Sequence, residues 1–292
     1  MARIALLTPA AHNPYVRIWG PAFDRLSAAL SGAGLEVVSV EWPKAVEAHA
    51  DAVLPLLAWG YHQDAADWLE MLDALEARGV KALNPAPLLR WNTTKTYLAD
   101  LEAAGVPVVP TVFADRADDA VVAAARAELG DGALVVKPQV SGGSHETVKL
   151  EPGEALVGGP SGAAMIQPFL PSVSGEGEIS LLHFDGVFSH AVGKVAKAGD
   201  FRVQPQFGST IGPIEPPPGA LDVAQAAIAA APGRLTYCRV DLIRHPDGTL
   251  RVMELEAIEP DLFLEHAAGA GAVFAAAVKR ASLAACCSGD HA

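Results

Sequence analysis

The chain has 292 residues and a net charge of −13 at pH 7. A chain this acidic is a poor general ligand for nucleic acids or for an anionic membrane surface, because both need a basic face. Hydrophobic side chains make up 51% of the sequence and are spread along its whole length, which excludes a largely disordered chain and suggests about two domains.

Cysteine use and the N-terminus indicate a reducing compartment. Cys238 lies in an apolar run, and Cys286 and Cys287 are adjacent near a polar tail. Neither spacing resembles a disulfide framework or a zinc site. The apolar run after Met1 is too short for a signal peptide, and no stretch approaches the about 18 apolar residues that suggest a membrane span. We therefore expect a cytoplasmic protein.

Strands and helices alternate in the first third of the chain. The predicted strands are short and apolar, at residues 3–8, 35–40, 52–58 and 80–83. The predicted helices, each followed by a glycine, are at residues 23–31 and 64–77. This alternation predicts a small parallel sheet with helices on its faces.

The middle of the chain is predicted to begin with a helix that has Asn92 as its N-cap and runs to about Ala104. It is followed by strands at 108–113, 133–138 and 163–169, with a helix at 118–129. The final third is richer in strands, with predicted hairpins at 177–192 and 235–255, a helix at 220–231 and a closing helix within residues 262–283. The whole pattern predicts an α+β fold with mixed sheets.

Two lysines near a glycine-rich loop are the first feature with chemical meaning. Lys137 ends an apolar strand just before the loop Ser141-Gly142-Gly143-Ser144, and Lys95 lies at a predicted helix start. Free backbone N–H groups, a helix N-terminus and lysine charges all favour a polyphosphate. A solvated strand end and an ordinary turn are the commoner explanations, so this feature alone does not decide.

Three carboxylates and an arginine are predicted to converge on the second hairpin. Arg239 and Asp241 lie on one face of a strand, and Glu254 and Glu256 lie on one face of the next. Like charges this close repel unless a cation neutralises them, and hard oxygen ligands suit Mg²⁺. A salt-bridged, solvent-facing sheet is the alternative. We favour the metal.

A basic and polar cluster lies between these features. Lys194 ends the first hairpin, and Arg202 follows a turn that contains Asp200. An arginine can bind carboxylate or phosphate oxygens through two hydrogen bonds. A solvated loop is the usual alternative, but a cationic cluster stands out in an acidic protein.

Seven short motifs follow one another in a particular order. They are Asn92-Thr-Thr-Lys95, Val135-Val-Lys137-Pro138, Ser141-Gly-Gly-Ser144, Gln167-Pro-Phe-Leu170, Glu178-Ile-Ser, Arg239-Val-Asp241 and Glu254-Leu-Glu256. This order resembles the ATP-grasp superfamily, and it is similar to D-alanine–D-alanine ligase, glutathione synthetase and the RimK-type ligases. The segments 254–260 and 200–204 look most like the branch that contains the D-cycloserine-forming ligase.

The resemblance implies a role for each matching residue. Lys95 and Lys137 look like phosphate-binding lysines, and Ser141, Gly142, Gly143 and Ser144 look like a mobile lid. Gln167, Phe169 and Leu170 look like the hinge that reads adenine, and Asp241, Glu254 and Glu256 look like metal ligands. Arg239, Arg202 and Lys194 look like catalytic residues that stabilise the transferred phosphoryl group. Glu256 departs from the family, which usually has Asn there, and this puts the second metal's geometry in question.

The resemblance also implies an ATP-grasp fold in three parts: a small N-terminal parallel α/β domain of residues 1–90, a central subdomain of 91–166 with the lid, and a C-terminal subdomain of 167–292 with the metal site. An acceptor pocket would lie between the first and last of these. Tyr61 and His62 are candidates to face it, although ordinary loop aromatics explain them as well. His145, directly after the lid, is more simply a solvated loop histidine.

The function implied is an ATP-dependent carboxylate–amine ligase that acts through an acylphosphate on a small amino-acid-like substrate and releases ADP and phosphate. Its cofactors would be ATP and two Mg²⁺ ions, for which Mn²⁺ can substitute. The alternatives are a cyclising ligase of the D-cycloserine-synthetase type, a small-molecule kinase on the same fold, and a non-catalytic nucleotide-binding regulator. We expect a small-molecule substrate and no nucleic-acid or membrane partner. Dimers are common in the family, so a dimer or larger homo-oligomer is an open expectation.

Overall fold

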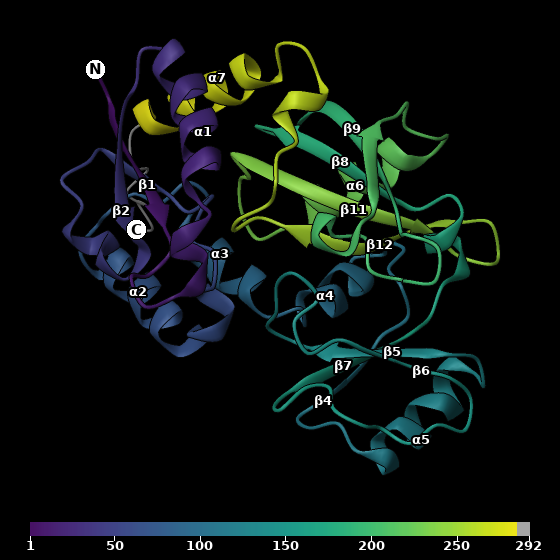
Figure 1. Ribbon diagram of the computed structural model, residues 1–292. Coiled ribbons are helices and arrows are strands. Elements are labelled where there is room, and N and C mark those ends of the chain that lie inside the picture. The colour runs from purple at the N-terminus through teal and green to yellow at the C-terminus, as the bar shows by residue number, and fades with distance from the viewer. Residues whose placement is uncertain (285–292) are drawn as a thin grey trace, which may run out of the picture.

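The computed structural model describes residues 1–284, which form three sheets with helices packed around them (Figure 1). The predicted roles of Cys286, Cys287 and the polar tail lie outside the described residues. Cys238 is a buried free thiol, as expected. Over residues 1–284, no helix is long and apolar enough to cross a membrane.

The N-terminal sheet is parallel, as predicted. Its strands are β1 (Arg3–Thr8), β2 (Glu36–Glu41) and β3 (Ala52–Leu54), in the order β2-β1-β3. Its helices are α1 (Gly20–Gly32) and α2 (Ala65–Ala77). The strand predicted at 80–83 is reduced to one bridge between Val53 and Ala82. Pro85 and Pro87 follow directly and cannot donate to a ladder, so the chain turns into a helix instead.

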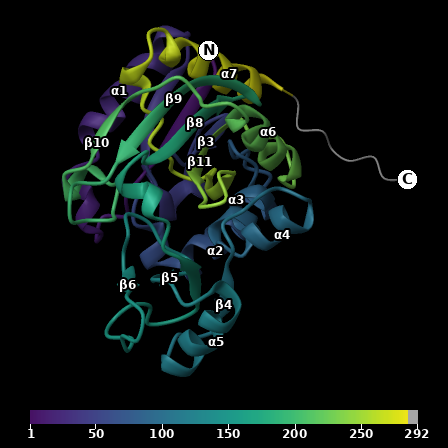
Figure 2. The same ribbon diagram turned by 90° about the vertical axis from the view of Figure 1, so that its right-hand side faces the viewer.

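The central sheet is antiparallel and has the order β4-β7-β5-β6. Its strands are β4 (Val112–Ala114), β5 (Leu134–Pro138), β6 (Val148–Leu150) and β7 (Ala164–Pro168). The helix α5 (Asp119–Leu129) covers it and begins where predicted, because the Asp118 side chain accepts a hydrogen bond from the Val121 N–H at 2.9 Å. Figure 2 shows this part as a lobe below the C-terminal sheet.

The C-terminal sheet is also antiparallel and has the order β10-β9-β8-β11-β12. Its strands are β8 (Glu178–Phe184), β9 (Val187–Val195), β10 (Thr210–Pro213), β11 (Tyr237–Arg244) and β12 (Leu250–Glu256). Both predicted hairpins are confirmed. In the first, Asp185 and Gly186 have φ values of 57° and 78°, as a tight hairpin turn requires. The helix α6 (Ala220–Ala230) packs on β11 and β12.

The closing helix α7 (Ala270–Leu283) lies within the segment 262–283 that was predicted to hold it. Residues 262–269 form an irregular segment in which Phe263 has a φ of 46°, which is incompatible with a continuous helix. α7 packs beside α1, so the two ends of the described chain meet, as the yellow and purple helices in Figure 1 show. One apolar core joins residues of β1, α1, α7 and the C-terminal sheet.

The segment around Asn92 differs from the prediction. Asn92 is not an N-cap but lies near the end of α3 (Ala86–Thr93), and a separate helix α4 (Tyr97–Ala103) follows. The Asn92 side chain donates to the Leu255 carbonyl and accepts from the Ala257 N–H, both at 2.8 Å. These buried backbone groups at the end of β12 need hydrogen-bond partners. The Asn92 side chain supplies both partners and therefore does not cap a helix. Lys95 therefore lies between two helices rather than in a helix's first turn.

The predicted strand at 108–113 is also shifted. β4 starts only at Val112, and the preceding residues pair instead with the edge of β12. The Val109 N–H donates to the Val252 carbonyl at 3.0 Å, and the Val252 N–H donates to Pro107 at 2.8 Å. This exchange satisfies the free edge of β12 and fixes the central part against the C-terminal sheet.

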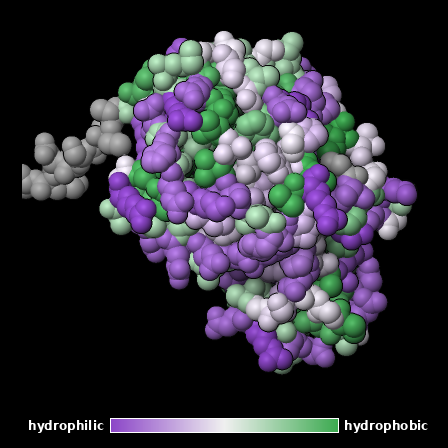
Figure 3. Space-filling view, turned by 60° about the vertical axis from the view of Figure 1, so that its left-hand side comes forward, coloured by the Kyte–Doolittle hydropathy of each residue, from purple (hydrophilic) through white to green (hydrophobic). Residues whose placement is uncertain are grey.

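The surface is mostly polar. On the face seen in Figure 3, hydrophilic residues form a broad band, and hydrophobic residues gather in separate groups above and below it. The strongly exposed large apolar side chains include Val157, Val187 and Leu283, which come from different parts of the chain. Scattered apolar residues of this kind are normal for a soluble surface.

Replacing Asn92 should destabilise the fold. In Asn92→Ala the Leu255 carbonyl and the Ala257 N–H lose their buried partner, which costs about 2–4 kcal/mol in the free energy of unfolding. Urea denaturation measures this change. Thr96→Ala, at an exposed position nearby, serves as the control and should change stability by less than about 0.5 kcal/mol. Equal stability of the two variants would contradict the bridging role of Asn92.

Candidate active site

A cavity of about 500 Å³ opens between the three sheets, and all of the site residues predicted from the sequence line it. This volume is typical of a small-molecule site. The predicted residues brought together are Lys95, Lys137, Ser141, Gly142, Gly143, Ser144, Gln167, Phe169, Leu170, Lys194, Arg202, Arg239, Asp241, Glu254 and Glu256. Tyr61 and His62 line it as well. Their individual roles remain predictions.

One end of the cavity is a flat apolar slot between the central and C-terminal sheets. Val135 lies in β5 and Leu170 lies just after β7, whereas Ile243 and Met253 lie in β11 and β12. The Phe169 ring packs edge-on against Phe201, with centroids 6.4 Å apart. A planar aromatic ring can be sandwiched in a slot of this shape, with backbone groups at its rim supplying polar contacts.

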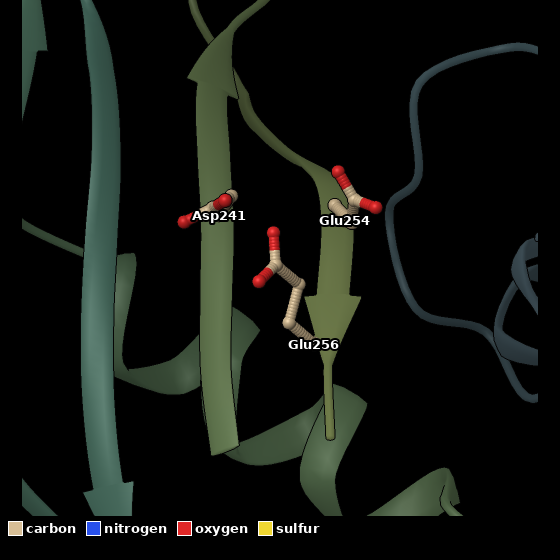
Figure 4. Close-up of side chains that lie close together, drawn as sticks. All are labelled: Asp241, Glu254 and Glu256. Carbon is tan, nitrogen blue, oxygen red and sulfur yellow. The ribbon is translucent and has the colours of Figure 1, made fainter. Parts of the chain in front are cut away.

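The three predicted metal ligands meet on neighbouring strands. β11 and β12 pair so that Arg239 lies opposite Glu256 and Asp241 lies opposite Glu254. Oxygen atoms of Asp241, Glu254 and Glu256 all lie within 4.8 Å of one another, and Figure 4 shows the Glu256 carboxylate pointing toward β11. Within the described residues this is the one group of acidic, histidine or cysteine side chains that is close enough to hold a metal ion.

Cations surround these carboxylates. Lys95 pairs with Glu254 at 2.5 Å, and Lys194 pairs with Asp241 at 3.1 Å. Arg239 contacts Asp241 at 3.0 Å through its Nε and Glu256 at 2.5 Å through its Nη2. Each of the three carboxylates therefore has a basic partner within the protein.

The balance of charge still favours an additional cation. Burial raises the pKa of Glu256 to about 7, an effect that Arg239 partly offsets and that the neighbouring Glu254 and Asp241 reinforce. Burial likewise raises the pKa of Glu178 to about 7, against the opposing charge of Lys194. Carboxylates that resist ionisation because they are buried and crowded are those that a hard divalent cation would stabilise. The donor set therefore fits Mg²⁺.

Lys137 is placed differently from the other lysines. Burial lowers the pKa of its ammonium group, while the charge of Glu254 opposes this shift. Its Nζ lies 3.8 Å from the Met253 sulfur, and it forms no ion pair within residues 1–284. Lys137 is partly buried, and a cation that loses much of its hydration without gaining an anionic partner is costly. Its position beside the slot and the glycine loop suits an anionic ligand.

The glycine-rich loop lines the cavity and is held at both of its ends. The Lys95 ammonium donates to the Ser141 carbonyl at 3.0 Å, and the Ser144 hydroxyl donates to Gln204 at 2.8 Å. Gly143 and Ser144 both have a φ of 61°, in the left-handed region that glycine adopts without strain.

Arg202 and Lys194 have partners that the sequence did not indicate. Arg202 is engaged by Asp200 at 2.8 Å and stacks on Phe207, with its guanidinium carbon 3.6 Å from the ring centroid. Lys194 also contacts Glu178. Both side chains line the cavity, yet in this state their charges are satisfied within the protein.

Several lining residues were not assigned roles from the sequence. Tyr15 and Trp59 come together because the Asn13 side chain accepts a hydrogen bond from the Tyr15 N–H at 3.0 Å and lies directly against Gly60. A Cβ at position 60 would come within 2.1 Å of Asn13, so glycine is required there. These contacts join loops far apart in the sequence, and no local pattern predicts them.

Glu259 is the other missed residue. It lines the cavity three positions after Glu256, so the acidic spacing of residues 254–259 was the signal that could have found it. His145, by contrast, is exposed, as expected, although its ring centroid lies 5.9 Å from that of His62.

Comparison with known proteins gives consistent matches. Residues 4–84 match the family described as the D-cycloserine synthetase DcsG N-terminal domain. The chain is 32% identical over 262 residues to the cycloserine biosynthesis protein DcsG of Streptomyces lavendulae, a match that spans 82% of this chain and 84% of that protein.

Solved structures extend the likeness to the whole fold. The crystal structure of D-cycloserine synthetase DcsG superposes with a TM-score of 0.79 at 28% identity, over 96% of this chain and 99% of that one. D-alanine–D-alanine ligase from Bacillus anthracis, complexed with ATP, gives a TM-score of 0.70 at 18% identity, over 97% and 98% of the two chains. The second likeness shows the fold alone, and it confirms the ATP-grasp architecture expected from the motifs.

Removing the Lys137 charge should weaken nucleotide binding. In Lys137→Ala the phosphates lose a charge-assisted hydrogen bond, so the affinity for Mg-ATP should fall by about 10- to 150-fold. Isothermal titration calorimetry measures it. Lys44→Ala removes an equal charge from an exposed pair with Glu41 and should leave the affinity unchanged. Unaltered binding in Lys137→Ala would refute the phosphate assignment.

Glu254→Gln should weaken metal binding while leaving the fold intact. The change keeps the shape of the side chain but removes one charged oxygen ligand, so we expect at least about tenfold weaker binding of Mn²⁺ in the presence of ADP. The Mn²⁺ electron paramagnetic resonance signal reports the bound fraction. Glu47→Gln, at an exposed position, is the matched control. If both variants bind Mn²⁺ as the parent does, Glu254 is not a ligand.

Proposed function

Because this chain belongs to the D-cycloserine synthetase DcsG branch of the ATP-grasp ligases, we propose that it uses ATP to close a ring within one small amino-acid derivative. The chain is an ATP-grasp ligase, and the relationship to DcsG favours the cyclising alternative over a reaction that joins two molecules. The relationship to DcsG carries the proposal, because it includes the N-terminal domain, several residues of which line the cavity.

The proposed chemistry has two steps. A carboxylate oxygen of the substrate attacks the γ-phosphorus of ATP in line, which breaks the bond to ADP and forms an acylphosphate. A nitrogen of the same substrate then attacks the acyl carbon, phosphate leaves with the electron pair of the carbon–oxygen bond, and the nitrogen loses a proton. D-cycloserine is a small ring in which a carboxyl carbon is bonded to an oxyamine nitrogen, so the substrate class is an amino acid with an oxyamine or ureido side chain.

The residues of the chain would position charge rather than form covalent bonds. Lys95 and Lys137 would bind phosphate oxygens, and Arg239 would stabilise the phosphoryl group and the oxyanion that follows. Arg239 suits this role because Asp241 and the Asp261 carbonyl, at 3.2 Å, fix its guanidinium group. Mg²⁺ held by Asp241, Glu254 and Glu256 would neutralise charge on the phosphates when bound.

Exclusion of water is the second contribution. An acylphosphate hydrolyses unless the site is closed, and the loop 141–144 is placed to cover it. Ring closure needs less protection than a two-substrate reaction, because the nucleophile is tethered to the acyl carbon. Effective molarities of intramolecular attack reach about 10⁵–10⁸ M. A small cavity with one substrate end is consistent with this mode.

Ring closure predicts a particular product pattern. With ATP and Mg²⁺, O-amino-D-serine or its ureido counterpart should give ADP, free phosphate and a cyclic product in equal amounts without any added amine. Coupled phosphate release and mass spectrometry measure the three products. The L-enantiomers and plain amino acids with added amines serve as comparison substrates.

The rival functions give other patterns. ADP without free phosphate would indicate a kinase, and an amide that forms only with a second amine would indicate an intermolecular ligase. Tight ATP binding without turnover of any substrate would indicate a regulator. Each of these outcomes would reject ring closure.

A further inference from the structure

Two polar side chains at the substrate end of the cavity lack partners. His62 is only 9% exposed, and both of its ring nitrogens are buried without a hydrogen bond in the described structure. Glu259 lines the same cavity, and within residues 1–284 it takes part in no ion pair or side-chain hydrogen bond. In contrast, Asp241, Glu254 and Glu256 each pair with a cation. His62 is buried and Glu259 is partly buried, and polar groups removed from water without a partner are rare in native proteins and call for an explanation.

Gly142 of the lid loop lies between these two groups. A Cβ placed on Gly142 would be 3.1 Å from the His62 Nδ1 and 3.6 Å from the Glu259 Oε1. The imidazole and the carboxylate therefore lie close together at one part of the cavity, and a side chain at position 142 would crowd the space between them. His62 comes from the N-terminal domain and Glu259 from the segment after β12, so the space forms only when the parts are assembled.

The chemistry of the pair defines what can fill this space. Burial lowers the pKa of His62 to about 4, so its imidazole is neutral near pH 7 and can accept a hydrogen bond. Burial, reinforced by Glu256, raises the pKa of Glu259 to about 8, as expected for a carboxylate without a positive partner. Without a positive partner the Glu259 carboxyl group is therefore mostly protonated near pH 7, and a bound cation with several N–H donors would stabilise its ionised form while the neutral imidazole accepts a hydrogen bond. A metal ion is less suitable, because within the described residues His62 and Glu259 belong to no cluster of three ligands.

The location matches one part of the proposed substrate. Glu259 follows Glu256 by three residues and is influenced by the charges of Glu256, Arg239 and Lys95. The space therefore adjoins the centre at which the substrate carboxylate would meet ATP. In an α-amino acid the ammonium group is separated from the carboxylate by a single carbon, so binding the carboxylate there brings the ammonium group to this neighbourhood.

We propose that Glu259 and His62 bind the α-ammonium group of the amino-acid substrate, with Glu259 as the ionic partner and His62 as a hydrogen-bond acceptor. This inference rests on the proposed function, in which the substrate is a single amino-acid derivative. It explains why the chain carries an acidic residue at 259 that neither pairs with a protein cation nor belongs to the metal cluster. It also accounts for glycine at position 142, because a side chain there would crowd His62 and Glu259 where they would bind the ammonium group.

The test compares ligands with and without that group. O-amino-D-serine and aminooxypropanoate differ only in the α-ammonium group, and calorimetry in the presence of Mg-ADP measures their binding without requiring turnover. The ureido pair is measured in the same way. The parent protein should bind the ammonium-bearing member about 10- to 150-fold more tightly, which is the range for charge-assisted hydrogen bonds. In Glu259→Gln this preference should fall to less than about threefold, while the affinity for Mg-ADP stays unchanged.

The control and the contrary outcomes are specific. Glu265→Gln removes a charge from an exposed position that lines the same cavity and should keep the preference. A preference retained in Glu259→Gln, or no preference in the parent protein, would overturn the inference. Failure of the proposed function would give a different result. The parent protein would then bind the ammonium-bearing ligand preferentially but would form no cyclic product with ATP.

A second variant tests the space itself. Gly142 is not in the left-handed region, so Gly142→Ala is compatible with the backbone, but its methyl group would meet His62 at 3.1–3.2 Å. We expect weaker binding of O-amino-D-serine and a smaller loss for aminooxypropanoate, with thermal unfolding and Mg-ADP affinity as in the parent. Equal losses for both ligands would show that the alanine disturbs the lid generally and would contradict the placement of the ammonium group.

Discussion

β11 and β12 pair antiparallel in a register that places Asp241 opposite Glu254 and Arg239 opposite Glu256. The same register buries Val240, Leu242 and Leu255 in the core, each at most 1% exposed. A slip by one residue would turn these apolar side chains toward the cavity and the charged ones into the core, so the hydrophobic face fixes the charged face. This pair of strands positions the other residues of the site. Arg239 lies on β11, Lys95 pairs with Glu254 of β12, and Lys95 in turn contacts the loop at Ser141. Asn92 reinforces the connection, because it binds the backbone on both sides of Glu256.

Charges in the cavity are paired at its centre and unpaired toward its ends. Arg239, Lys95 and Lys194 neutralise the central carboxylates. Lys137 on the nucleotide side lacks an anionic partner in the described structure, and Glu259 on the other side lacks a cationic one. As we propose, a nucleotide phosphate would satisfy the first and a substrate ammonium group the second. A nucleotide and an amino-acid substrate bound next to each other would then place a negative group beside Lys137 and a positive group beside Glu259.

Local sequence patterns predicted much of this arrangement. The strands carrying the site and their hairpin turns were predictable because alternating burial and turn residues such as Asp185 and Gly186 act over a few residues. All of the site residues predicted from the order of the motifs line one cavity in the structure. The errors arose where distant groups competed with local preference. Asparagine is a common N-cap residue, but Asn92 instead forms hydrogen bonds with the backbone of β12. In the strand expected at 108–113, the first residues pair with the edge strand β12 of the neighbouring sheet. The meeting of Tyr15, His62 and Glu259 depends on loops from separate parts of the fold, and no periodicity encodes it.

Glu256 shows how one substitution relative to the family pattern changes the site. An asparagine at this position could offer an oxygen to a metal, but it could not form an ion pair with Arg239. The glutamate does so at 2.5 Å, while Asp241 contacts the same guanidinium group and the Asp261 carbonyl accepts from it. Arg239 is therefore held by groups on three sides before any ligand binds. Because little reorganisation is then needed when charge develops on a phosphoryl group, the additional acid contributes to preorganisation as well as to negative charge. Its cost is the crowding that raises its own pKa, and a bound divalent cation would relieve that cost.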